Sequence, residues 1–170
     1  MTEISMLIKE QLRTIKVIHF TMVMANVIYG IVIYYIYLYA PVPPSLTDIQ
    51  LITNLEYASV PYVLSIVVIA KIIRNKMLAS DSIFIKREET KKGPDRPPFI
   101  GNYISSLFVV WAIIEVIAIA GIILFLTTGK LTVSLALIAA GVFFMLANGP
   151  RLEELNKLSA KYESISVQGE

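Results

Sequence analysis

Residues 103–126 read YISSLFVVWAIIEVIAIAGIILFL and contain one charged residue, Glu115. A bilayer core about 30 Å thick requires about 20 mainly apolar residues in a helix, because lipid offers no hydrogen-bond partner to an unpaired backbone amide. This stretch of 24 residues meets that requirement. It predicts a helix that spans a membrane, and therefore an all-α integral membrane protein.

Three other stretches meet the same requirement. Residues 17–39 and 131–147 carry no charge, and residues 57–73 carry only Lys71. The run at 131–147 is followed by Asn-Gly-Pro at 148–150, a combination that ends helices. The sequence therefore predicts four transmembrane helices arranged as two hairpins.

The composition supports the same class of protein. Of the 170 residues, 56% are hydrophobic and only 16% are charged, against about 25% charged in soluble domains. The absence of cysteine excludes disulfides and thiolate chemistry, and the single histidine, His19, cannot form a multi-histidine metal site within one copy. We expect neither a metal nor a cofactor.

The remaining sequence divides around these helices. Ile4, Ile8, Leu12 and Ile15 recur at helical spacing and predict an amphipathic segment that runs directly into the first transmembrane helix. We expect five parts: a cytoplasmic amphipathic segment (1–16), a first transmembrane hairpin (17–76), a charged cytoplasmic loop (77–99), a second transmembrane hairpin (100–148), and a cytoplasmic interfacial helix and tail (149–170).

Two finer features concern the connections. Ser45 and Asp48 have the spacing of a capping box, and we expect a long helix from there that is kinked at Pro61. Residues 81–98 are rich in charged residues and proline, and are either a solvated loop or a contact with lipid headgroups or a partner.

Lys and Arg residues are distributed very unevenly between the two ends of these helices. The N-terminus carries three, the second connection with its flanks eight, and the C-terminus three, whereas the opposite side carries only Lys130. Positive charge remains on the cytoplasmic side of membrane proteins. We therefore expect a multi-pass protein of the cell membrane with both termini in the cytoplasm.

Glu115 is the residue that most requires an explanation. It lies about twelve residues from each end of 103–126, which places it near the bilayer midplane at about 1.5 Å per residue. A charge at this depth costs from about 2.5 to more than 10 kcal/mol, so the carboxyl group is expected to be neutral or to face protein.

Residues at similar depth suggest how the carboxyl group is accommodated. Asn26 can both donate to and accept from a carboxyl group, and it is our first choice of partner for Glu115 in a proton or cation site. The expected supporting layer consists of Trp111, Ala112, Ala118 and Ser65. The small residues at 112 and 118 would allow another helix to approach closely. Two interpretations remain open: an ion-carrying carboxyl group, or a protonated acid that joins helices.

The string WAIIEVIAIAGIILFLTTG at 111–129 resembles the rotary ATPase proteolipids and the uncharacterised bacterial four-helix membrane proteins similar to them. That resemblance implies that Glu115 is the ion-carrying carboxylate. The strings IYGIVIYY at 28–35 and IAGIILFL at 119–126 are similar to each other. This similarity is either an internal repeat, which would match the duplicated form of the proteolipids, or chance. The proteolipids carry their carboxylate on the returning helix of a hairpin, whereas Glu115 is on the outgoing helix. A weaker similarity links the chain to small multidrug transporters, whose membrane glutamate lies in the first helix.

Two functions remain after the other classes are considered. No nucleophile–base pair, phosphate-binding glycine loop or paired carboxylates occur, so we expect a non-enzyme, and the basic residues already explain orientation without nucleic acid. The favoured function is an accessory or anchoring subunit of a larger membrane complex, with the lipid bilayer and either membrane proteins or further copies of the chain as partners. The alternative is a protein that couples protons or cations through Glu115.

Overall fold

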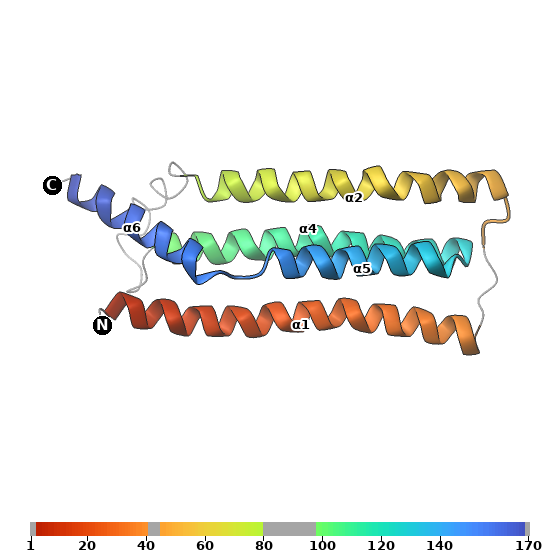
Figure 1. Cartoon of the computed structure of the whole chain (residues 1–170), viewed down its shortest axis with the longest axis horizontal. Coiled ribbons are helices and arrows are strands. Elements are labelled where there is room, and N and C mark those ends of the chain that lie inside the picture. Colours follow the sequence, from red (N-terminus) through yellow and green to blue (C-terminus); the bar gives the residue numbers. More distant parts are fainter. Residues whose placement is uncertain (1–2, 41–44, 80–97, 169–170) are drawn as a thin grey trace.

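Every regular element is an α-helix in the parts that the computed structural model describes, residues 3–40, 45–79 and 98–168 (Figure 1). Each apolar stretch found in the sequence lies within one helix, and two of these helices extend well beyond it. The helices are α1 (Glu3–Tyr39), α2 (Ile49–Met77), α4 (Pro98–Thr128), α5 (Leu131–Ala147) and α6 (Leu152–Gln168).

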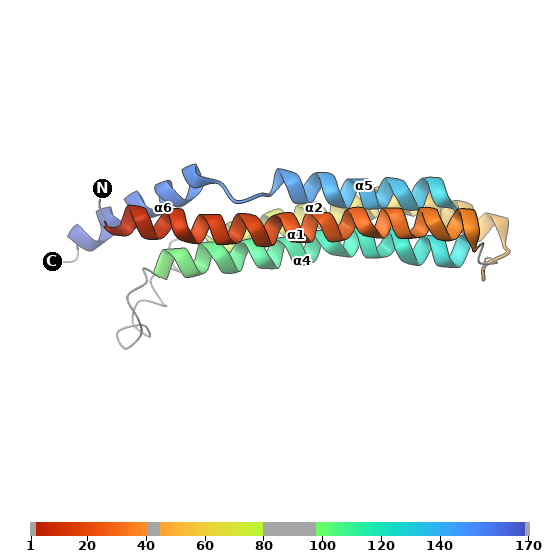
Figure 2. The same cartoon turned by 90° about the horizontal axis from the view of Figure 1, so that it is seen from below.

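The four long helices run alternately up and down, with α4 and α5 between α1 and α2 (Figures 1 and 2). The main contacts of α1 are with α5 and α4, and those of α2 are with α4 and α5. The α4–α5 pair is thus a packed hairpin, as predicted for residues 100–148. The two helices of the expected first hairpin at 17–76, α1 and α2, follow one another in the chain but lie on opposite sides of this pair.

Glycine residues allow α4 and α5 to approach closely. A Cβ atom on Gly121 would lie 2.8 Å from the Ser134 carbonyl oxygen, and one on Gly141 would lie 3.3 Å from Ala118 Cβ. The turn between the helices is short because Gly129 adopts φ 68°, a left-handed conformation that ends α4. The α4–α5 pair is therefore the most tightly packed part of the bundle.

Apolar side chains cover much of the outer surface. Three helices, α1, α2 and α4, are long and apolar enough to cross a membrane, and α5 with α6 becomes a fourth if this bent pair is counted as one span. Only 6% of the most apolar window of α2 is buried within the protein. Exposed apolar residues such as Ile28, Val68 and Ile123 require an apolar environment, and a bilayer provides one.

The predicted helix limits have mixed outcomes. From Glu3 onward, the amphipathic segment predicted for 1–16 is the first part of α1, and the helix continues from it without a break. The α5 helix ends at Ala147, as predicted. The capping box is wrong: Asp48 caps α2 by accepting from the amides of Gln50 and Leu51, and the Ser45 hydroxyl donates instead to Thr127. Most of the charged loop 77–99 lies outside the described residues.

We predict that replacing Gly121 by Ala destabilises the bundle. The new methyl group meets backbone rather than a flexible side chain, so α4 and α5 must separate, at a cost of about 1–3 kcal/mol in the free energy of unfolding. SDS titration of the chain in detergent micelles measures this loss. Gly101→Ala is the matched control in the same helix, since nothing lies within 4 Å of its Cβ position, and its stability should be unchanged or higher. Equal stabilities for the two variants would contradict the packing argument.

Candidate functional site

Glu115 lies in the middle of α4, on the edge that faces α1. Its side chain is partly buried, and its Oε1 atom accepts a hydrogen bond of 3.4 Å from the Tyr29 hydroxyl. Tyr29 belongs to α1, so this bond joins two helices near the centre of the bundle. Both a neutral and an ionised carboxyl group can accept it.

Asn26 is not the partner of Glu115, contrary to the prediction. Its side chain is fully buried, and its amide group donates to the Met22 carbonyl oxygen at 3.2 Å and to Met145 Sδ at 3.6 Å. Its carbonyl oxygen has no hydrogen-bond partner in the described part of the chain. The short amide faces α5, whereas Tyr29, one turn further along α1, is long enough to reach Glu115.

The predicted supporting layer is only partly assembled. Trp111 and Ala118 are fully buried, and Ala118 packs against Gly141 of α5 as the small-residue argument requires. Ala112 is exposed on the outside of α4. Ser65 is exposed on α2 and donates to the Pro61 carbonyl oxygen of its own helix at 2.8 Å, so it takes no part in a layer around Glu115.

Exposed residues continue along α4 beside Glu115. Four of these exposed residues are separated by four, seven and seven positions: Phe108, Ala112, Ile119 and Leu126. Such spacings place side chains on one face of a helix. We call these four residues, with Glu115 at their edge, the α4 stripe. It is apolar except for one carboxyl group.

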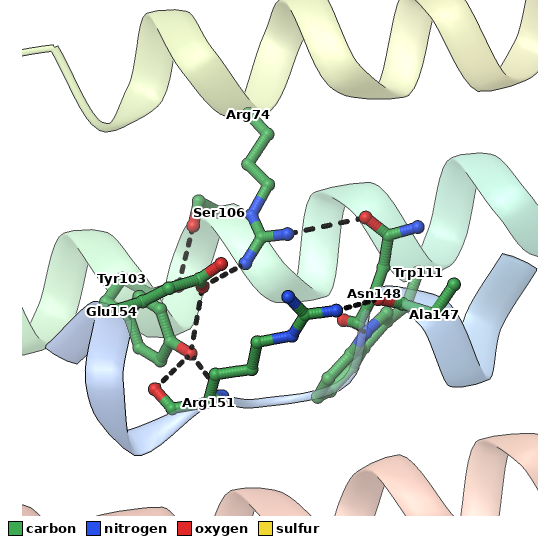
Figure 3. Close-up of polar contacts among 8 residues, drawn as sticks. All are labelled: Arg74, Tyr103, Ser106, Trp111, Ala147, Asn148, Arg151 and Glu154. Carbon is green, nitrogen blue, oxygen red and sulfur yellow. Dashed lines mark hydrogen bonds and ion pairs between the residues drawn. The ribbon is translucent and has the colours of Figure 1, made fainter.

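A second polar cluster surrounds the break between α5 and α6, where the two helices are bent by 45° (Figure 3). A helix end leaves its last carbonyl groups without helical partners. Here, Asn148 and Gly149 donate to the carbonyls of Phe144, Met145 and Leu146, and the Arg151 guanidinium donates to that of Ala147 at 3.0 Å. The chain therefore satisfies the end of α5 from its own next residues.

Side chains from other helices complete this arrangement. His19 of α1 donates from Nε2 to the Met145 carbonyl oxygen at 2.9 Å, which requires the tautomer protonated at Nε2. Trp111 of α4 donates to the Asn148 carbonyl oxygen at 3.0 Å, and its ring packs against that of His19 with centroids 4.9 Å apart. His19 is thus buried, and its structural partner is the end of α5.

Tyr103 and Arg74 hold the start of α6. The Tyr103 hydroxyl accepts from the Arg151 amide at 2.8 Å and can donate its proton to the Arg151 carbonyl oxygen or to Glu154. Arg74 of α2 forms an ion pair with Glu154 and also donates to the Asn148 side chain at 3.3 Å (Figure 3). Sequence reasoning did not find this cluster, because its members are up to 126 positions apart and carry no local motif.

Neither polar region has the composition of a metal centre. Within residues 3–40, 45–79 and 98–168, no group of three or more His, Asp or Glu side chains is placed to hold a metal ion. The chemistry that these two regions show is hydrogen bonding and ion pairing.

Comparisons with protein-family models, curated proteins and solved structures found no match to this chain. The arguments about its function therefore depend on its own residues.

We predict that Tyr103→Phe loosens α6 from the bundle. The substitution keeps the buried ring but leaves the Arg151 amide without its acceptor, which costs about 1–3 kcal/mol. Thermal unfolding in detergent and the rate of proteolysis between α5 and α6 measure the effect. Tyr57→Phe removes a hydroxyl group from a side chain that is 76% exposed and should change neither quantity. An unchanged proteolysis rate in Tyr103→Phe would contradict the proposed role of the hydroxyl.

Proposed function

We propose that this protein is a non-enzymatic, multi-pass membrane protein that acts as an accessory or anchoring subunit of a larger membrane complex. Four spans are proposed: α1, α2, α4, and α5 with the start of α6. The remainder of α6 then lies at the interface, in agreement with its polar composition.

The proposed orientation follows from charge. The start of α1, the ends of α2 and α5, and the whole of α6 lie at one end of the bundle (Figure 1). That end carries Lys9, Arg13, Lys16, Arg74, Lys76, Arg151 and Lys157. At the other end Lys130 is 3.8 Å from Glu56, so this single basic residue faces a carboxylate. The positive-inside rule assigns the first end to the cytoplasm.

The α4 stripe is the observation that carries the subunit proposal. In a lone copy the partly exposed Glu115 carboxyl group would lie at the edge of a lipid-facing surface, where the described residues give it one hydrogen bond, of 3.4 Å. Acidic groups inside membranes normally face protein or water. A helix of a partner packed over Ala112 would cover the carboxyl group, because the small side chain permits close approach.

Ion coupling is the second candidate, and the Tyr29–Glu115 contact favours it. A partly exposed carboxyl group near the midplane that accepts from a hydroxyl group can bind and release a proton. This function also requires neighbouring copies or partner helices to enclose a pathway, since one four-helix bundle encloses little space. The two candidates therefore share the same surface and differ in whether Glu115 titrates.

We predict that Ala112→Leu separates the protein from its complex. The larger side chain projects from the α4 stripe and opposes close helix contact, which should weaken association about tenfold or more. Size-exclusion chromatography of the chain extracted in a mild detergent measures the fraction in the complex. Ser65→Leu is the matched control, because Ser65 is exposed on α2 away from the stripe. A complex that tolerates Ala112→Leu as well as Ser65→Leu would contradict the proposed interface.

Glu115→Gln distinguishes the two candidates. Glutamine keeps the size of the side chain and an oxygen that accepts from Tyr29, but its amide group does not release a proton as a carboxyl group does. For an anchoring subunit we expect the complex to assemble as before and to retain its activity. Loss of proton- or cation-dependent transport in reconstituted vesicles, with assembly intact, would instead establish ion coupling.

A further inference from the structure

A basic cavity lies beside the polar cluster at the α5–α6 break, between that break and α2. Its volume is about 630 Å³. Four cationic side chains line it, Lys71 and Arg74 from α2 and Arg151 and Lys157 from the other side, together with one carboxylate, Glu154. The described residues of the lining therefore have a formal charge of +3, which favours an anionic ligand.

Three of the four cations are available to such a ligand. Arg74 is held by Glu154 and Asn148, and its side chain is only 14% exposed. Lys71, Arg151 and Lys157 are exposed. The Arg151 guanidinium uses one nitrogen for the Ala147 carbonyl oxygen, and its other donors are not needed there. The ion pair of Arg74 with Glu154 is thus a fixed part of the lining. The exposed side chains of the other three cations can bind a phosphate.

The remaining lining contains Asn75, Asn148 and several apolar residues, and some of the apolar ones come from deeper in the bundle. Val67 and Ala70 lie one turn or less from Lys71 on the bilayer side, and Ile114 lies next to Glu115 in the middle of α4. One cavity is therefore cationic at its outer part and apolar toward the membrane. A free phosphate ion needs only the first part, whereas a phospholipid uses both.

We propose that this cavity binds the headgroup of an anionic phospholipid from the cytoplasmic leaflet, with the phosphate between Lys71, Arg151 and Lys157 and an acyl chain along Val67 and Ala70. Basic pockets between transmembrane helices on the cytoplasmic side are suited to such headgroups. The inference rests on the membrane location and orientation given under Proposed function, but it does not depend on the partner complex. It assigns the lipid a structural role, since it would join α2 to α6 at the break.

The test compares two lipids with the same acyl chains, phosphatidylglycerol and phosphatidylcholine, on the full chain in a non-ionic detergent. Native mass spectrometry counts the retained lipid, and the unfolding temperature reports its stabilising effect. We expect phosphatidylglycerol to be retained in preference to phosphatidylcholine. Each lysine removed near a membrane surface should weaken binding about fivefold, so Lys71→Gln with Lys157→Gln should weaken it about 25-fold.

Lys76→Gln is the matched control, because Lys76 is an exposed lysine of α2 outside the cavity. Its retention of phosphatidylglycerol should equal that of the unchanged chain. Equal retention of the two lipids, an equal loss in the control, or equal stabilisation by inorganic phosphate at the same concentration would overturn the lipid site.

Failure of the site and failure of the membrane proposal can be separated. A chain that floats with phosphatidylcholine vesicles but does not discriminate between the lipids overturns only the lipid site. A chain that does not float with vesicles contradicts the membrane location itself.

Discussion

Polar backbone groups in an apolar environment must be paired within the protein, and the rest of this structure depends on that constraint. Continuous helices satisfy it along α1, α2 and α4. The chain departs from continuous helix between α5 and α6, and there the carbonyls of residues 144–148 find partners in Asn148, Gly149, Arg151, His19 and Trp111. The break is thus possible because α1 and α4 supply donors to it. The only histidine and the only tryptophan of the chain both serve this purpose.

The bundle has two polar regions of opposite character. The polar cluster at the α5–α6 break is extensive, since α1, α2, α4, α5 and α6 all contribute and its ion pair is partly shielded from solvent. Among the described residues, the central region contains Glu115 and one hydrogen bond to its carboxyl group, from Tyr29. A well-satisfied cluster stabilises a structure, whereas a carboxyl group with little support is a reason to expect a further contact. This contrast is why we assign a structural role to the first region and an intermolecular role to the second.

Local properties were predictable from the sequence, and contacts between distant segments were not. The α5 limits follow from an apolar run closed by Asn-Gly-Pro, and the continuity of α1 follows from its spacing of apolar residues. The close packing of α4 against α5 depends on Gly121 and Gly141, which permit a contact that no periodicity reveals. The partner of Glu115 was misassigned to Asn26 because depth along a helix does not specify rotation about its axis. Tyr29 differs from Asn26 by one turn and by the reach of its side chain.

The central claim is that lipid surrounds the outer faces of these helices and that Glu115 lies at the midplane. Site-directed spin labelling tests it most directly, and the absence of cysteine allows a single label at each chosen position. Val116→Cys, Gly101→Cys and Leu126→Cys sample the exposed side of α4 at its middle and near its two ends. In vesicles, the ratio of collisions with oxygen to collisions with a water-soluble nickel complex should be highest at residue 116 and lower at 101 and 126. Free access of the nickel complex to residue 116 would contradict the account.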